Sequence, residues 1–466
     1  MGLQPVYRVK SHLVPIIAVL LIPVALGSFG SIFNDGDVSW HIATGQWILS
    51  HGVIPKSDPF SFTWAGRPWV PIEWLAEVIM AAAYRLGGYG GISALATAAL
   101  IALHAIVFVN GSRFVRPLPL LGAIVAMDIV LIPMMLARPH LLAWPLFALW
   151  TVLLLRARQE DRAPPLIAAL LMSVWANLHG SFVLGLLIAA VFALEAVSES
   201  KDRAQTLRQW GLFGLLAGLA AFVNANGMAG VLHPLRIANM SLLPLIDEWK
   251  PSNPAVTPFF FVILAGGILL LLRKRPTMHP VRWLLLVALL GLALLQVRHQ
   301  AVLAIAAALI LPSAFSKEPK PSEVSQPFWW SVAAAAVALI GIRVAVPITP
   351  PDGEANPWKL IAAVPAGLRS QPVLNGYVMG GPLILSGIRT YVDGRGDMYG
   401  DELVIGYKRI TDGDTAKLNE AVDKWGIHWA ILPHRYKKLV ALLDRAAEWR
   451  KIHEDETGVI FVRVSA

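Results

Sequence analysis

The chain has 466 residues, of which 56% are hydrophobic and 15% are charged, and it contains no cysteine. Soluble globular proteins carry about a quarter charged residues, so this composition indicates a membrane protein. The missing cysteines exclude disulfides, thiolate metal sites and cysteine nucleophiles. The net charge of +9 does not indicate a nucleic-acid partner, because Lys and Arg lie largely in short loops between apolar runs.

Long apolar runs fill most of the chain up to residue 347. A membrane-spanning helix needs roughly 17–25 such residues, and we predict eleven spans. They lie near residues 12–29, 91–110, 118–136, 139–155, 164–178, 181–197, 210–225, 257–272, 281–297, 300–315 and 328–347. The first run lacks a small-residue cleavage site, so we expect a retained helix instead of a signal peptide. The predicted fold is an α-helical polytopic bundle over residues 1–350, followed by a soluble α/β domain over 351–466.

Basic clusters at every second connection predict the orientation. Placing them in the cytoplasm puts the N-terminus inside the cell. The large loop 30–90, later short links and the C-terminal domain then face outward. Residues 73–87 also have a helical pattern, but a span there would invert every later loop. We therefore predict an interfacial or re-entrant helix for this segment.

The predicted outer links are rich in polar and ionisable side chains, whose placement near hydrocarbon costs free energy. In the first loop these are Asp35, Asp37, His41, Asp58, Arg67 and Glu73, interleaved with five tryptophans. Later outer links add Arg138, His140, Asn177, His179, Asn224, Asn226, His233, Asp247, Glu248, Arg298 and His299. Links at one end of a helix bundle lie within a few helix diameters of one another, so we expect these side chains to converge on one cavity. Asp37 and His41, four residues apart, would share a helix face.

Several of these groups also have a structural interpretation. Tryptophans at a membrane edge are usually belt anchors, and residues 58–61 are typical of an Asx turn. Asp35 fits a helix cap, whereas Arg138 fits snorkelling or capping as well as phosphate binding. For the Asp35 and Asp37 pair we favour the functional interpretation. Two neighbouring carboxylates that face a cavity lose hydration, and a bound cation, a role as a base or a role as a helix cap must offset this free-energy cost.

Other residues and motifs narrow the function further. His179 and His299 fit satisfied core histidines as well as ligand-binding groups. No phosphate-binding glycine loop is present, so coupling to ATP is not expected. Zinc-protease spacings of histidine are also absent from the sequence.

The motifs as a group resemble those of a known superfamily. The first loop contains DGDVSWHIATGQWIL and DPFSFTWAGRPWVPIEWLAEV, and ARPHLLAW, WANLHGSFVLG, DEWKP, VRHQ and YVDGRGDMYGDE follow. Together they resemble poorly characterised bacterial membrane proteins of the C-type glycosyltransferase (GT-C) superfamily. The resemblance implies a cell-envelope enzyme of the bacterial inner (plasma) membrane, surrounded by membrane lipids. It also implies transfer of a sugar from a polyprenyl-phosphate donor to a lipid, glycan or protein acceptor.

The resemblance also suggests roles for individual residues. It places the acidic loop motif of the superfamily on Asp35 and Asp37 as catalytic residues. Their D-x-D spacing differs from the adjacent acidic pair of some relatives, which leaves open which carboxylate acts and whether a divalent cation bridges the two. The expected substrate-binding residues are His41, Glu73, Arg138, His140, Asn177, His179, Glu248, Arg298, His299, Asp393 and Arg395.

The C-terminal segment has the patterning of a mixed α/β domain. We predict helices near 357–369, 414–424 and 434–447, strands near 372–375, 390–393 and 427–432, and a hairpin through 450–464. Its YVDGRGDMYG segment contains Asp393, Arg395 and Asp397. These residues fit a surface turn with an internal ion pair, or a lip that covers the cavity and selects the acceptor.

Two other classes of function compete with sugar transfer. A transporter or flippase of a lipid-linked glycan would also place polar groups at a membrane face. Against it, the sequence shows no internal repeat, and its charges are expected to be confined to one side and not distributed toward the midplane. A non-catalytic membrane assembly protein is the third possibility, but it leaves the many acidic, His and Arg residues of the outer links unexplained.

Overall fold

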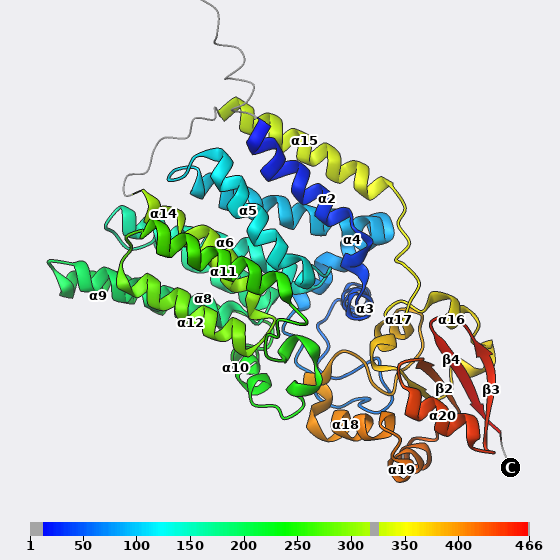
Figure 1. Ribbon diagram of the computed structural model, residues 1–466. Helices are drawn as coiled ribbons and strands as arrows, with labels where there is room; N and C mark the ends of the chain where they lie inside the picture. Colours follow the sequence, from blue (N-terminus) through cyan, green and yellow to red (C-terminus); the bar gives the residue numbers. More distant parts are fainter. Residues whose placement is uncertain (1–12, 317–325, 465–466) are drawn as a thin grey trace, which may run out of the picture.

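The computed structural model describes residues 13–316 and 326–464 and consists of two parts (Figure 1). A bundle of helices forms the larger part. A C-terminal unit, residues 352–464, combines helices with a small sheet at one end of the bundle. We call the bundle end that contacts this unit the near end, and the opposite end the far end.

Helices occupy each of the apolar segments predicted to span a membrane. They are η1 (Ile17–Leu21) with α2 (Ile22–Ser28), α4 (Trp74–Gly111), α5 (Pro117–Leu131), α6 (Pro139–Gln159), α7 (Leu170–Leu178), α8 (Phe182–Glu199), α9 (Arg203–Ala221), α11 (Pro258–Lys274), α12 (Pro280–Leu295), α13 (His299–Ile310) with α14 (Pro312–Phe315), and α15 (Gln326–Ala345). Among the described residues, five helical segments are long and apolar enough to cross a membrane, namely Trp74–Gly111, Pro117–Met134, Pro139–Gln159, Phe182–Glu199 and Gln326–Ala345. Helices of the membrane-spanning type are therefore present, whereas the full number of spans stays a prediction.

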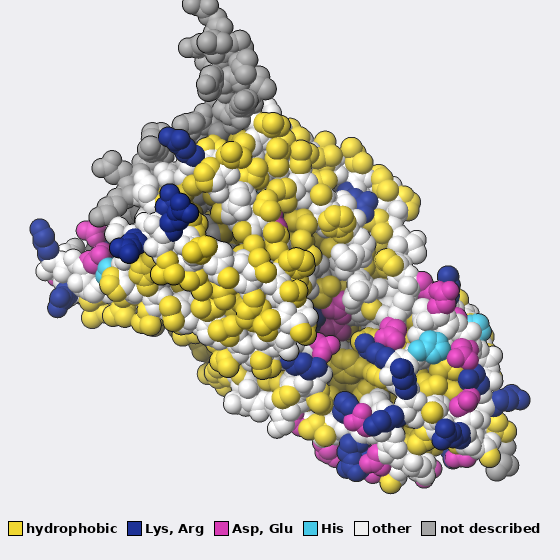
Figure 2. Space-filling view, viewed as in Figure 1, with side chains coloured by type: hydrophobic (Ala, Val, Ile, Leu, Met, Phe, Trp, Pro, Cys, Tyr) yellow, Lys and Arg dark blue, Asp and Glu magenta, His cyan; other side chains and the backbone are white. Residues whose placement is uncertain are grey.

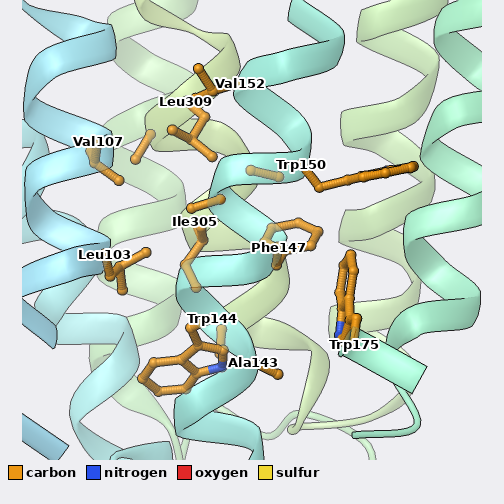
Figure 3. Close-up of a cluster of buried hydrophobic side chains, with 14 of the residues drawn as sticks. Leu103, Val107, Ala143, Trp144, Phe147, Trp150, Val152, Trp175, Ile305 and Leu309 are labelled. Atoms are coloured by element: carbon orange, nitrogen blue, oxygen red, sulfur yellow. The ribbon is translucent and has the colours of Figure 1, made fainter. Parts of the chain in front are cut away.

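The surface of the bundle matches this composition. Figure 2 shows a broad hydrophobic belt over the visible face of the bundle, with Lys and Arg at its far end and mixed charges over the C-terminal unit. Inside the bundle, large aromatic and aliphatic side chains fill the space between α4, α6, α7 and α13 (Figure 3). Trp150 is fully buried, and its indole N–H donates to the carbonyl of Gly185 over 2.8 Å. This packing holds the near ends of these helices in a fixed arrangement.

The segment predicted as an interfacial or re-entrant helix is the first part of α4. Gly87 and Gly88 have non-helical backbone angles, and Gly88 adopts a positive φ of 55° that favours glycine. A Cβ on Gly91 would overlap the carbonyl oxygen of Ala83. In a straight helix residues eight apart are about 12 Å apart, so the chain bends sharply between residues 83 and 91. The first part therefore packs back against the second.

The connections at the near end contain short helices. They are η2 (Gly30–Phe33), α3 (Asp37–His51), α10 (Gly227–Ala238), η5 (Leu243–Leu245) and η6 (Asp247–Trp249). The α3 helix packs along α4, and α17 (Gly380–Leu385) of the C-terminal unit packs on α3. A Cβ on Gly381 would overlap the carbonyl oxygen of Gly36, and one on Gly36 would overlap that of Val378. Glycine at both positions therefore permits backbone contact between the two parts.

The C-terminal unit has a four-stranded mixed sheet of order β1-β2-β4-β3. Its strands are β1 (Val373–Asn375), β2 (Trp429–Pro433), β3 (Trp449–Glu454) and β4 (Gly458–Arg463), with β1 and β2 parallel and the other pairs antiparallel. Its other helices are α16 (Trp358–Ala362), α18 (Gly396–Thr411), α19 (Thr415–Trp425) and α20 (Lys437–Arg445). The predicted strand near 390–393 is wrong, because Thr390 forms only an isolated bridge with Ser61. The predicted surface turn around Asp397 is also wrong, because this residue lies in the first turn of α18.

Candidate functional site

Arg138 lies at the centre of a charged cluster at the near end of the bundle. Its guanidinium is 2.9 Å from the Asp37 carboxylate and 3.1 Å from that of Asp35. It is also 3.3 Å from the carboxylate of Glu248. Arg298 is 3.8 Å from the same Glu248 side chain. The carboxylates and Arg138 are 17–28% exposed, so the cluster lies partly within reach of solvent.

Local structure positions each member of this cluster. The backbone N–H of Asp37, the first residue of α3, donates to the Asp35 carboxylate over 2.9 Å, so Asp35 satisfies the first free N–H of this helix. Arg138 directly precedes α6. The η6 loop is joined to the α12–α13 link, because the Arg298 N–H donates to the Glu248 carbonyl over 3.0 Å. The Arg298 guanidinium also lies 4.2 Å from the centre of the Trp249 ring. Four connections that are distant in sequence therefore meet here.

The electrostatics of this cluster differ from those of exposed carboxylates. Burial, followed by repulsion from Asp35, raises the pKa of Asp37 to about 7 even though Arg138 opposes the shift. Burial acts to raise the pKa of Glu248 as well, but the charges of Arg138 and Arg298 outweigh burial and lower the pKa of that carboxyl. The pKa of Arg138 is raised because its carboxylate neighbours outweigh its burial. Near neutral pH, Asp37 is therefore the member of this cluster poised to exchange a proton.

A second group of side chains adjoins the charged cluster on α3. Glu73 lies between two imidazoles, 3.4 Å from His179 Nε2 and 3.8 Å from His41 Nε2. The other ring nitrogen of His41 is 3.2 Å from Glu77. Burial raises the pKa of Glu73 to about 8, and it lowers the pKa of both His41 and His179 well below the usual value. Near neutral pH, Glu73 is therefore mostly protonated and its histidine neighbours are uncharged.

The C-terminal unit covers the charged cluster. A Cβ on Gly394 would overlap Asp37 Oδ1. Two further contacts join this unit to the near-end loops. The imidazole of His233 in α10 is 2.8 Å from Asp397 of α18, and Asp401 accepts hydrogen bonds from the backbone after α10. The C-terminal unit therefore lies directly against the Asp37 side chain and is joined to the loops around it.

The side chains of Asp393 and Arg395 lie in the interior and pair with each other instead of with a described member of the charged cluster. Their side chains are 0% and 1% exposed, so the predicted surface location is wrong, whereas the predicted internal ion pair between them is confirmed. Arg395 is 2.6 Å from Asp393 and 2.7 Å from Asp58 of the first loop. Asp58 accepts hydrogen bonds from the backbone of residues 60 and 61, as predicted for an Asx turn. This ion-paired triad therefore joins the first loop to the C-terminal unit.

Three other predicted site residues have different surroundings. Asn177 uses its amide fully, accepting from Trp74 and the backbone of residue 225 and donating to two carbonyls. His140 contacts the carbonyl of Met134 over 2.8 Å, and its ring centre is 6.4 Å from that of His179. His299 begins α13 beside Arg298 but makes no hydrogen bond or ion pair with any described carboxylate. Asn177 is thus a brace between loops, whereas His140 borders the site.

No group of three or more metal-ligating side chains occurs in the described ranges. At Asp35 and Asp37, the cation between the two carboxylates is the guanidinium of Arg138. A divalent ion there would have to displace this guanidinium and take its remaining ligands from water or substrate. The described residues therefore fit an arginine-centred site, and the divalent cation stays a prediction.

Sequence reasoning missed two buried polar contacts inside the bundle. His104 of α4 lies 3.0 Å from Asp128 of α5, and both side chains are buried between helices of the membrane-spanning type. Glu195 of α8, 2% exposed, pairs with Arg282 at 2.7 Å and with Arg158 at 3.3 Å. The expectation that charges are confined to one side is thus wrong for His104 and Asp128, which lie within helices of the membrane-spanning type. Their isolated positions in long apolar runs were the available signal.

A shallow groove lies on a different face of α3. Its volume is about 420 Å³, and its lining includes Gln46, Trp47, Ser50, Phe60, Arg85 and Leu385. Because successive helix residues are rotated by about 100°, these α3 side chains point away from the Asp37 and His41 face. The groove is therefore separate from the charged cluster.

Comparisons with known proteins add no relative. No protein-family model matches this sequence, and no curated protein matches it significantly.

Proposed function

We propose that this chain is a membrane glycosyltransferase of the C-type superfamily, which moves a sugar from a polyprenyl-phosphate donor to a lipid, glycan or protein acceptor. In this proposal eleven spans cross the bacterial inner membrane. The N-terminus is cytoplasmic, and the near end with the C-terminal unit faces the extracytoplasmic side. The motif resemblance of the first loop and the basic far end of the bundle support this arrangement.

The observation that carries the proposal is the meeting of Asp35, Asp37 and Glu248 around Arg138 at one end of an apolar bundle. Sugar transfer from a lipid phosphate needs a base for the acceptor hydroxyl and cationic donors for the departing phosphate. Both kinds of group are present within one cluster. Its location next to the hydrophobic belt suits a donor with a prenyl chain in the membrane and its sugar phosphate at the surface.

The proposed reaction assigns a role to each charged group. Asp37 accepts the proton of the acceptor hydroxyl, whose oxygen forms a bond to the anomeric carbon. The bond between that carbon and the phosphate oxygen breaks, and its electron pair leaves with the phosphate. Arg298 and Arg138 stabilise the departing phosphate through their planar donors. Asp35 orients Asp37 and Arg138, because it contacts the backbone of one and the guanidinium of the other.

The decisive experiment measures transfer or donor hydrolysis by purified protein in nanodiscs with a panel of radiolabelled polyprenyl-phosphate sugars. Asp37→Asn should lower the rate by at least about 100-fold, as expected when a general base is lost. The matched control is Asp247→Asn, because Asp247 is 94% exposed beside Glu248 and, within the described ranges, pairs only with Lys250. Equal rates in Asp37→Asn and wild type would remove the catalytic role of Asp37. Intact donors throughout the panel would refute the proposed reaction.

The His104 and Asp128 pair favours transport or flipping of a lipid-linked glycan as a second candidate function. Ionisable side chains inside a membrane-spanning bundle often mark a transport or proton path. A flux assay in proteoliposomes distinguishes the two candidates. Movement of a lipid-linked glycan that is lost in Asp128→Asn, with no chemical change to the glycan, would support transport. Sugar transfer that persists in Asp128→Asn would support the enzyme.

A further inference from the structure

The groove beside α3 is built from parts of the chain that are distant in sequence. On α3 it is lined by Ala43, Gln46, Trp47 and Ser50, which recur at intervals of three and four residues and therefore share one face of the helix. The other lining residues come from the first loop, from the first part of α4 and from α17 of the C-terminal unit. The groove thus lies where the bundle, the first loop and the C-terminal unit meet.

The groove has apolar and aromatic surface inside it. Ile384 of α17 is only 7% exposed and forms part of its floor, whereas Trp47 and Phe60 are half-buried at its sides. The Trp47 ring stacks on His51 with 4.1 Å between the ring centres, and the Arg395 guanidinium lies 5.2 Å from the centre of the Phe60 ring. Protein therefore covers one face of each ring, and the opposite face is the one that can border the groove.

Polar side chains of the same groove have unused hydrogen-bonding capacity. Neither the Gln46 amide nor the Arg85 guanidinium makes a hydrogen bond or an ion pair with a described residue, and both line the groove. An amide donates and accepts, whereas a guanidinium donates through a planar fork. The Ser50 hydroxyl donates to the carbonyl of Trp47 over 2.9 Å and keeps oxygen lone pairs for a ligand. A small apolar surface is therefore bordered by free donors and acceptors.

The charge of the groove comes from one residue. Of the lining residues in the described ranges, Arg85 alone is charged, and no carboxylate lines the groove to neutralise it. A guanidinium binds a carboxylate through two parallel N–H···O bonds, a geometry that an ammonium group does not offer. Charge complementarity therefore favours a ligand with a carboxylate.

The surroundings favour a ligand that comes from water. Ser50 and His51, at the end of α3, are exposed. The α17 helix belongs to the C-terminal unit, whose surface carries mixed charges (Figure 2). Leu86, next to Arg85, is 77% exposed and would suit a lipid instead. A lipid is therefore the occupant that the experiment must distinguish from a water-soluble ligand.

We propose that this groove binds a hexuronate, a sugar that carries a carboxylate, as one unit of a larger glycan. The C–H face of the sugar ring packs on Trp47, its hydroxyls bond to Gln46 and Ser50, and its carboxylate pairs with Arg85. The volume of about 420 Å³ lies within the usual range of small-molecule sites, roughly 300–1,000 Å³. The groove is on the opposite face of α3 from Asp37, so this binding involves no chemical step and does not rest on the proposed sugar transfer.

Saturation-transfer NMR on the full chain in phosphatidylcholine nanodiscs tests the groove, because maltoside detergents carry a competing sugar head group. The probes are methyl hexuronides of gluco, galacto and manno configuration, each compared with its neutral methyl hexoside. At least one hexuronide should bind more tightly than its neutral partner, by about threefold or more at low salt. Empty nanodiscs should give no signal.

Three variants assign the binding to the groove. Arg85→Gln should remove the preference for the hexuronide and change binding of the neutral sugar by less than about twofold. Trp47→Ala should weaken both sugars by about fivefold or more, because the apolar contact with the ring is lost. The matched control is Arg116→Gln, which removes an exposed arginine from the α4–α5 connection and should keep the preference of wild type.

Several outcomes would overturn the proposal. One is that no hexuronide of the panel binds better than its neutral partner, and another is that Arg85→Gln keeps the preference of wild type. An equal loss in Arg85→Gln and Arg116→Gln would show diffuse attraction to positive charge. Native mass spectrometry that finds a bound phospholipid in wild type but not in Trp47→Ala, with no sugar bound, would identify a lipid site. If Trp47→Ala does not fold, the result for Arg85→Gln decides alone, because this substitution changes an exposed side chain.

Discussion

Gly394 of the C-terminal unit lies directly against the carboxylate of Asp37 at the start of α3. A Cβ at position 394 would overlap Asp37 Oδ1 and come within 2.9 Å of the indole nitrogen of Trp40. Glycine is therefore required here by contact with a side chain of the proposed active centre. The same contact covers Asp37 on the side of the C-terminal unit, while 17% of the Asp37 side chain stays exposed.

The first prediction concerns Gly394→Ala. The added methyl group should displace the Asp37 carboxylate from Arg138 or hold the C-terminal unit away from α3. Either change misplaces a catalytic group, so we expect the transfer rate to fall by about 10- to 100-fold. The matched control is Gly406→Ala in α18, where a Cβ meets no atom within 4 Å. The control should keep full activity and melt at an equal or higher temperature. Equal rates in both variants would show that the contact with Asp37 has no catalytic importance.

The second prediction concerns the pH dependence of transfer. Burial and repulsion from Asp35 raise the pKa of Asp37 to about 7, with Arg138 opposing and Glu248 adding to the shift. The ionised form that serves as base therefore accumulates as the pH rises through 7. We expect kcat/KM to increase about tenfold per pH unit well below this pKa and to level off above it. If kcat/KM did not change between about pH 5.5 and 8.5, the transfer rate would not depend on the ionisation of Asp37.

The third prediction separates the protonated from the ionised form of Glu73. Because its pKa is raised to about 8, chiefly by burial, Glu73 is mostly neutral at pH 7. Glu73→Gln keeps a neutral polar group between His41 and His179, so we expect activity within about threefold of wild type at pH 7. Glu73→Ala removes the contacts to both histidines and should lower activity by more than about tenfold. Activity measured for the two variants at pH 7 checks this, and an inactive Glu73→Gln would indicate that the ionised carboxylate is needed.

The fourth prediction concerns Arg138. Arg138→Gln leaves Asp35, Asp37 and Glu248 near one another without their shared cation. We expect the transfer rate to fall by at least about 100-fold, as when a donor to a developing anion is removed. The apparent melting temperature should fall as well. Arg138→Lys keeps the charge but not the planar donors, so it should restore thermal stability more than activity. A lysine variant with full activity would show that only the charge matters.

The charged cluster shows what the sequence could predict. Arg138, Glu248 and Arg298 lie in connections that the apolar runs place at one end of the bundle, and such connections must be neighbours. The spacing of Asp37 and His41 likewise predicts a shared helix face. Residue patterns at the helix ends therefore predicted which polar residues lie at the near end. They did not predict which of these residues touch.

Other features depend on packing that a single sequence does not display. Asp58 and Arg395 are 337 positions apart and are both polar, so composition places them at the surface, whereas the structure buries them together. His104 and Asp128 each interrupt an apolar run, and only helix packing shows that they satisfy one another. Gly394 stands between Asp393 and Arg395 in the sequence. Its contact with Asp37 arises from the placement of the whole C-terminal unit on α3.

The last prediction concerns the joint between the first loop and the C-terminal unit. Asp58→Asn keeps the size of the side chain but removes the charge that faces Arg395, whose side chain is 1% exposed. Breaking one side of a buried ion pair typically costs about 3–5 kcal/mol, although Asp393 still binds Arg395 here. We therefore expect a clear drop in melting temperature and faster proteolysis between α15 and the C-terminal unit. The matched control is Asp412→Asn, whose carboxylate is 54% exposed and pairs with Lys408 on the surface. A surface pair of this kind contributes only about 0–1 kcal/mol to stability. If the two substitutions lowered the melting temperature equally, the Asp58 and Arg395 pair would not be what holds the C-terminal unit over the charged cluster.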